Sequence, residues 1–191
     1  MKKEIIISGF GGQGVMSIGK SLVEAGIHEN LEVTWVPSYG PEMRGGSANC
    51  SVVLSDTKIG APVFDEFNEL IAMNNVALEK FLPDLKEKGN LFVNSNAATN
   101  QIDRTDIQVY YIPCDSIAQE LGNARVANMV MLGAYAKATK TLKMETLQNM
   151  IQHMFTGKKA KMVDINIEAL KRGAECVMYA FKMEHEKKIT V

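Results

Sequence analysis

The sequence contains no long hydrophobic run and few cysteines. Nowhere do 18 uncharged apolar residues follow one another, so we expect no membrane-spanning helix. The first apolar run, Ile5–Ile7, is too short for the hydrophobic region of a signal peptide. Cys50, Cys114 and Cys176 are 64 and 62 residues apart, a spacing that fits neither a zinc site, an iron–sulfur cluster nor a CxxC motif. These absences predict a cytoplasmic protein with reduced thiols.

A charge excess of either sign is also missing. The 21 Lys and Arg residues against 22 Asp and Glu residues give a net charge of -1, which is too neutral for a dedicated nucleic-acid binder. Apolar residues make up 46 % of the 191 residues, so the chain can form a core and is not disordered. We therefore expect one globular domain with no nucleic-acid or membrane partner.

The first half of the chain begins with a strand and a helix. A β-branched run predicts a strand over residues 3–8, and apolar residues spaced by three and four predict an amphipathic helix from Val15 to about residue 28. Two further strands are predicted over 31–37 and 47–54. The ten or so residues between them are too few for a helical crossover, so we expect these two strands to be antiparallel.

The rest of the chain alternates strands with helices and then becomes helical. A short segment at Ile59 and Gly60 is a candidate hairpin return. Further strands are predicted over 70–73, 91–93 and 107–112, with a helix over 76–85 that Pro83 interrupts, and helices over 115–121, 124–140, 143–155 and 163–182. This order predicts parallel βαβ units. The predicted fold is a single α/β domain over 1–182, a three-layer αβα, Rossmann-like domain with a mixed, mostly parallel open sheet and a helical C-terminal part, followed by a tail over 183–191.

A glycine-rich loop joins the first strand to the first helix. The sequence GFGGQG over Gly9–Gly14 matches GxGxxG in that context. Glycines let the backbone approach a ligand, and the N–H groups at a helix start favour an anion. We predict that a cofactor phosphate or carboxylate is bound by Gly9, Gly11, Gly12, Gln13 and Gly14. A tight turn that binds nothing remains the alternative.

Two common nucleotide sites are disfavoured. An NAD site needs an acidic residue at the end of the second strand, but that strand ends in Trp35–Pro37, and Glu29 and Glu32 lie before it or at its start. No Gly-Lys-Ser/Thr follows the glycines, so a Walker loop is absent as well. A self-sufficient dehydrogenase is therefore disfavoured.

A second loop follows the second strand with the sequence PSYGPEMRGG over residues 37–46. It starts at the carboxyl end of a strand, where open α/β sheets bind ligands. Arg44 offers a planar fork of donors for phosphate or carboxylate, and Glu42 can orient Arg44. The predicted binding residues here are Ser38, Tyr39, Gly40, Glu42, Arg44, Gly45 and Gly46. A rigid turn with a surface ion pair is the alternative.

The pair of motifs is more specific than either one. GFGGQGV at 9–15 followed by PSYGPEMRGG at 37–46 resembles the gamma subunit of the 2-oxoacid:ferredoxin (acceptor) oxidoreductases, and the similarity runs from Met1 to about Phe181. That family oxidatively decarboxylates pyruvate, 2-oxoglutarate, ketoisovalerate or indolepyruvate. The resemblance implies an oxidoreductase subunit that is inactive alone and helps form the coenzyme A and substrate side of a thiamine-dependent site. A freestanding nucleotide- or coenzyme A-binding regulatory module is the runner-up.

The resemblance also implies where the cofactors lie. Thiamine diphosphate, Mg²⁺ and a [4Fe-4S] cluster are expected in partner alpha and beta subunits, with coenzyme A as co-substrate at the shared site and ferredoxin as electron acceptor. A ferredoxin-like delta subunit is a further candidate partner. The sequence agrees, since it has neither clustered cysteines nor a GDG-type thiamine motif, and we assign this chain no catalytic residue and no metal ligand. The 2-oxoacid, the stoichiometry and self-association of the isolated chain stay open.

One predicted helix is unusually apolar. Residues 126–136 are apolar nearly all round, which predicts a helix buried on more than one face. Gly133, Ala134 and Ala138 permit a close helical neighbour, and Asn128 is expected to find a hydrogen-bond partner there. Burial within the domain and burial against a partner subunit both remain possible.

Overall fold

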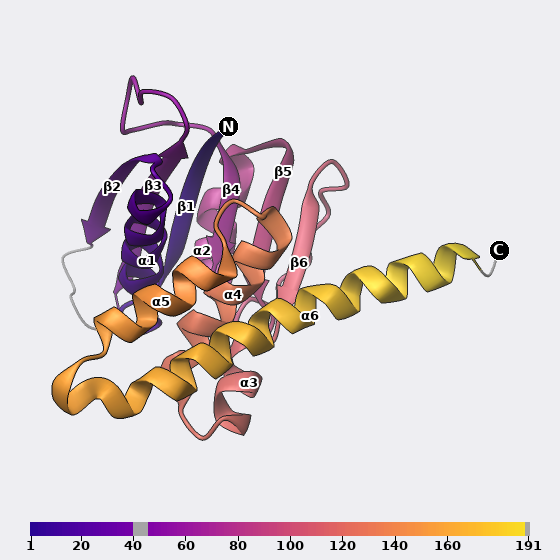
Figure 1. Cartoon of the computed structure of the whole chain (residues 1–191). Helices are drawn as coiled ribbons and strands as arrows, with labels where there is room; N and C mark the ends of the chain where they lie inside the picture. The colour runs from indigo at the N-terminus through magenta and orange to yellow at the C-terminus, as the bar shows by residue number, and fades with distance from the viewer. Residues whose placement is uncertain (40–45, 190–191) are drawn as a thin grey trace.

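A computed structural model describes residues 1–39 and 46–189 of the chain, without the side chains of residues 39, 158 and 178–189. The chain folds into one six-stranded sheet in the order β2-β3-β1-β4-β5-β6 (Figure 1). The strands are β1 (Lys2–Phe10), β2 (Glu32–Tyr39), β3 (Ser47–Ser55), β4 (Phe67–Ala72), β5 (Leu85–Asn94) and β6 (Gln108–Ile112). The α-helices are α1 (Val15–His28), α2 (Asn75–Phe81), α3 (Cys114–Glu120), α4 (Ala127–Thr139), α5 (Met144–Met154) and α6 (Val163–Ile189).

The sheet is mixed, as the sequence predicts. β1, β4, β5 and β6 are parallel neighbours, whereas β3 is antiparallel to both β1 and β2. The predicted antiparallel pairing of the second and third strands is confirmed, with Glu32 opposite Ser55 and Tyr39 opposite Ala48. Since β1 and β2 both run antiparallel to β3, their carboxyl ends lie at the same edge of the sheet. The two loops that the sequence singles out therefore start at the same edge of the sheet, with β3 between the strands that they follow.

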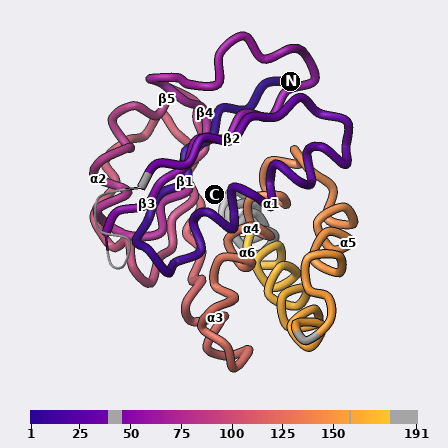
Figure 2. The backbone as a smooth tube through the Cα atoms, turned by 90° about the vertical axis from the view of Figure 1, so that its left-hand side faces the viewer, coloured from indigo at the N-terminus to yellow at the C-terminus, as the bar shows by residue number. Residues whose placement is uncertain are grey.

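Helices cover the two faces of the sheet unequally. α1, α4, α5 and α6 lie over one face, and α2 lies over the other (Figure 2). Consecutive residues of β1 serve both faces, because Ile5 and Ile7 belong to the larger core cluster, which includes residues of α1 and α4, and Ile6 to the smaller one, which includes residues of α2. A strand buried on both faces explains why the run at Ile5–Ile7 is continuously apolar rather than alternating. The α/β fold is confirmed.

α4 is the helix that the sequence predicts to be buried all round. Every residue from Ala127 to Ala136 is buried. Its close neighbour is α6, because a Cβ on Gly133 would lie 1.9 Å from the carbonyl oxygen of Leu170, and one on Gly173 would lie 1.8 Å from that of Val130. Glycines on both helices let the two backbones touch. The chain therefore buries this helix within its own domain.

Three predicted element bounds differ from the structure. Ile59 and Gly60 form no strand, because β3 is already paired on both edges and offers no place for a hairpin return. Pro83, which lacks an N–H, lies in a 3₁₀ turn (Leu82–Asp84) after α2 rather than inside a longer helix. α6 runs to Ile189, since residues 183–189 contain no Gly or Pro to end it, so this part of the expected tail is helical. No helix in the described part of the chain is long and apolar enough to cross a bilayer.

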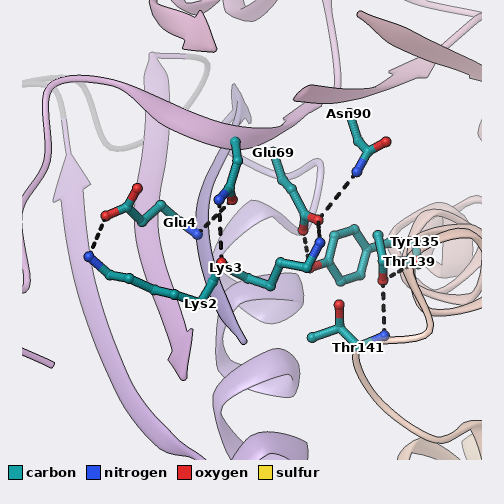
Figure 3. Close-up of polar contacts among 9 residues, drawn as sticks. Lys2, Lys3, Glu4, Glu69, Asn90, Tyr135, Thr139 and Thr141 are labelled. Atoms are coloured by element: carbon teal, nitrogen blue, oxygen red, sulfur yellow. Dashed lines mark hydrogen bonds and ion pairs between the residues drawn. The ribbon is translucent and has the colours of Figure 1, made fainter. Parts of the chain in front are cut away.

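A buried carboxylate joins the helical layer to the sheet (Figure 3). Glu69 on β4 is fully buried, and it accepts hydrogen bonds from Lys3 Nζ at 2.6 Å and from the hydroxyl of Tyr135 on α4. Asn90 Nδ2 donates a third at 3.4 Å. Burial and the nearby negative charge raise the pKa of Tyr135, so its hydroxyl stays protonated as a donor. The sequence analysis gave Glu69 no role.

Candidate functional site

The carboxyl edge of β1 and β2 brings the ends of the two predicted loops together. The N–H of Gly11 in the glycine loop donates a hydrogen bond to the carbonyl of Gly46, the last residue of the second loop, at 3.0 Å. The other end of the second loop, at Ser38, lies in β2 beside Asn49 of β3. Gly40, Glu42, Arg44 and Gly45 lie outside the described residues, as does the side chain of Tyr39. Their part in the site stays a prediction.

The glycine loop has a backbone that needs glycine at two positions. Gly12 has a φ of 102° and Gly14 a φ of 77°, in the region that residues with a Cβ rarely adopt. The N–H of Gln13 donates to the carbonyl of Phe10 at 3.1 Å and closes the turn. Gly14 is the N-cap of α1, and no side chain caps that helix start. The N–H groups of its first turn therefore have no side-chain acceptor at this helix start.

Gln13 turns inward and shapes the loop. Its Oε1 accepts hydrogen bonds from the N–H of Phe10 at 2.7 Å and from Asn74 Nδ2 at 2.9 Å, while its Nε2 donates to the carbonyl of Met73 at 3.0 Å. Gly9 makes room for this arrangement, because a Cβ there would lie 2.7 Å from Gln13 Oε1 and 2.8 Å from Met73 Cβ. Of the five predicted binding residues in the glycine loop, Gly9 and Gln13 thus make contacts inside the protein, whereas Gly11 and Gly12 are exposed.

Asn74 extends this arrangement to α2. It follows β4, is only 4 % exposed, and its Oδ1 accepts from the N–H of Ala77 at 2.8 Å as the N-cap of α2. One amide thus caps a helix and holds Gln13. The sequence analysis missed this residue. An Asn between a strand and a helix is a recognisable N-cap signal, although its contact with Gln13, 61 positions away, is not.

Asn128 also lies at this edge. It belongs to the first turn of α4, and a Cβ on Gly14 would lie 2.6 Å from Asn128 Cβ and 2.8 Å from Asn128 Nδ2. The expectation that Asn128 finds a hydrogen-bond partner beside a neighbouring helix is wrong for the described residues. Its side chain lies against the glycine loop and makes no hydrogen bond with any part of the chain that the structure describes.

Metal and cluster ligands are sparse. Within residues 1–39 and 46–189, no group of three or more His, Cys, Asp and Glu residues could hold a metal ion. Cys50 and Cys114 are buried free thiols, and burial raises the pKa of Cys50 to about 11 and that of Cys114 well above its usual value. The described residues therefore offer no ligand set for an iron–sulfur cluster or for Mg²⁺.

Comparison with known protein families matches residues 4–176 to the family described as "Pyruvate ferredoxin/flavodoxin oxidoreductase". The chain belongs to this family. The matched range contains both loops and the helix pair α4–α6 as far as residue 176. The resemblance that the two motifs carry is thereby confirmed.

Individual members of the oxidoreductase family agree with this assignment. The chain is 37 % identical over 170 residues to "Ketoisovalerate oxidoreductase subunit VorA" of Methanothermobacter marburgensis. The aligned region covers 88 % of this chain and 35 % of that protein. It thus spans about a third of the length of this relative. A gamma subunit of keto/oxoacid ferredoxin oxidoreductase from Geobacter sulfurreducens has a TM-score of 0.82 at 29 % identity, and the likeness covers 94 % of this chain and 98 % of that one.

A larger solved enzyme contains the same fold. The 2-oxoglutarate:ferredoxin oxidoreductase of Magnetococcus marinus, described with 2-oxoglutarate, coenzyme A and succinyl-CoA bound, has a TM-score of 0.86 at 26 % identity. The likeness covers 93 % of this chain and 31 % of that one. The fold of this family member therefore occurs both as a chain of similar length and as one part of a longer chain.

Proposed function

We propose that this chain is a gamma-type component of a 2-oxoacid:ferredoxin oxidoreductase. The match over residues 4–176 supports this, together with the likeness to a gamma subunit along nearly the whole chain. The complete enzyme decarboxylates a 2-oxoacid, transfers the acyl group to coenzyme A and passes the electrons to ferredoxin. Two of the relatives are named for different 2-oxoacids, ketoisovalerate and 2-oxoglutarate, so we propose the substrate class and not one substrate.

The role of this chain is to bind and orient coenzyme A or the 2-oxoacid. The observation that carries this is the hydrogen bond from Gly11 to Gly46, which joins the glycine loop to the loop that contains Arg44. The open start of α1 supplies N–H donors for an anion, and Arg44 supplies a charged fork for the same group. The Magnetococcus enzyme with coenzyme A bound supports coenzyme A as the ligand class.

The chemical steps belong to partner subunits. Thiamine diphosphate and Mg²⁺ supply the decarboxylation and an iron–sulfur cluster the electron transfer, and the described residues of this chain form a ligand set for none of them. We therefore expect alpha and beta subunits to hold these groups, with a site completed by the two loops of this chain. In the VorA relative the matched region is 35 % of the protein, so further sequence accompanies this fold there.

The test is co-expression of this chain, with an affinity tag, together with the alpha and beta subunits of a 2-oxoacid:ferredoxin oxidoreductase from the same organism. We expect the subunits to co-purify and to reduce ferredoxin with a 2-oxoacid and coenzyme A. Arg44→Ala should lower kcat/KM for coenzyme A or the 2-oxoacid with assembly intact, and the loss should correspond to about 1.5–3 kcal/mol, the usual value of a hydrogen bond to a charged group. A chain that binds coenzyme A but never associates would instead be a freestanding module.

A further inference from the structure

The Asn128 side chain is a buried amide that the fold leaves without a partner. Asn128 is 7 % exposed, and no hydrogen bond from the described residues reaches its side chain. Side chains this buried usually find a hydrogen-bond partner within the protein, so the free donor and acceptor of this amide call for an explanation. Among the described residues, the fully enclosed unpaired side-chain atoms belong to Ser21, Thr34, Trp35 and Thr141, and neither amide atom of Asn128 is one of them. The amide of Asn128 therefore still reaches solvent at its tip.

The position of this amide is set by the glycine loop. Gly14 carries the α1 start, and its Cα lies against the Asn128 side chain so closely that a Cβ would be 2.6–2.8 Å from Asn128 Cβ, Cγ and Nδ2. Asn128 is thus held beside the uncapped N–H groups of α1. It comes from α4, whose position is fixed by its tight packing on α6 through Gly133 and Gly173. The amide is held on a rigid element, as a ligand contact requires.

We propose that Asn128 contacts the ligand of the glycine loop. This rests on the proposed function. The N–H groups of α1 bind an anionic group of the ligand, and the Asn128 amide binds an uncharged polar group next to it, such as a hydroxyl or an amide. An amide offers both a donor and an acceptor, and it adds no charge beside the anion. Coenzyme A, with phosphates and amides in one molecule, fits this pattern.

The experiment measures the Kd of coenzyme A by calorimetry on the assembled oxidoreductase, for wild type, Asn128→Ala and Asn128→Asp. Asn128→Ala should raise the Kd about tenfold, which corresponds to about 1.4 kcal/mol. Asn128→Asp keeps the size of the side chain and should raise the Kd further, because its charge repels the anion. Since Asn128 makes no hydrogen bond within the described chain, we expect the thermal midpoint of Asn128→Ala to change little.

Asn123→Ala is the matched control. Asn123 lies five residues earlier, and its side chain accepts from the N–H of Arg125 at 3.0 Å, so it is engaged within the chain. This variant should keep the wild-type Kd. Wild-type Kd values in both Asn128 variants, or equal losses in Asn123→Ala and Asn128→Ala, would overturn the inference. Wild-type enzyme that assembles but binds no coenzyme A would instead refute the proposed ligand, and the inference with it.

Discussion

At the scale of single residues, the described part of the site is held by side-chain amides. Gln13 connects the strand end at Phe10 to Met73, and Asn74 connects Gln13 to the start of α2. Each oxygen and each donor has a defined partner, so the glycine loop has little freedom to collapse when it is empty. The loop therefore has a fixed shape before any binding, and the ligand that we propose for it would lose less entropy on binding.

Asn74→Asp separates the two roles of this residue. An aspartate still caps α2 through the oxygen that faces the N–H of Ala77, but it presents a second oxygen to Gln13 Oε1 in place of a donor. We expect the free energy of unfolding to fall by about 1–2 kcal/mol. Asn74→Ala, which also loses the cap, should lose more. Urea denaturation measures both, and an Asn74→Asp variant as stable as wild type would contradict this account of Gln13.

At the scale of elements, the contact between α4 and α6 depends on two glycines. Gly133 and Gly173 bring each helix against a carbonyl of the other, so the helices cross more closely than larger side chains would permit. This close crossing lets α4 lie between the sheet and α6 with all residues from Ala127 to Ala136 buried. The same crossing fixes the position of Asn128, on α4, against Gly14 of the glycine loop.

Gly133→Ala tests this crossing. Its Cβ would lie 1.9 Å from the carbonyl oxygen of Leu170, so the two helices must separate, and we expect a loss of about 3 kcal/mol or more in the free energy of unfolding. Gly60→Ala is the control, because nothing lies within 4 Å of its added Cβ and its φ is not positive. That variant should change stability by less than about 1 kcal/mol. Similar urea midpoints for the two variants would show that the helices can shift freely.

At the scale of the whole molecule, the core excludes water well enough to raise the pKa of a buried thiol and of a buried tyrosine. Burial raises the pKa of Cys50 from 9.0 to about 11, and burial together with Glu69 raises that of Tyr135. Both groups are neutral when protonated, so the folded state favours their protonated forms. Their contribution to stability is complete below the unfolded pKa and is lost as the pH rises through the folded pKa.

Global stability should therefore fall in alkali. Between pH about 9 and about 11 the Cys50 thiol alone should remove about 2–3 kcal/mol from the free energy of unfolding, because one pKa unit corresponds to about 1.4 kcal/mol. Urea denaturation across this range measures the slope. In Cys50→Ala the free energy of unfolding should fall less between pH about 9 and about 11, by that amount, and its pH dependence below pH 8 should be unchanged. An identical pH dependence in the two proteins would show that the thiol ionises inside the folded state.

The turn of the glycine loop and the antiparallel pairing of β2 with β3 could be predicted from the sequence, since each depends on local chemistry. Gly12 and Gly14 have the positive φ that a tight turn demands, and the short connection before Ser47 allows only an antiparallel return of the chain. The family resemblance could be recognised from the sequence too, because each of its two motifs is a run of consecutive residues. Such features depend on neighbours in sequence, so the sequence by itself determined them.

The roles of Gln13, Asn74 and Asn128 were decided only by the tertiary structure. Gln13 and Asn74 are 61 positions apart, and Asn128 lies more than a hundred positions from Gly14, yet all meet at one edge of the sheet. The sequence shows the same Asn or Gln whether the side chain binds a ligand, caps a helix or supports a loop. Strand order and the glycine contact of α4 with α6 choose among these roles, because they determine which distant groups lie within hydrogen-bond distance.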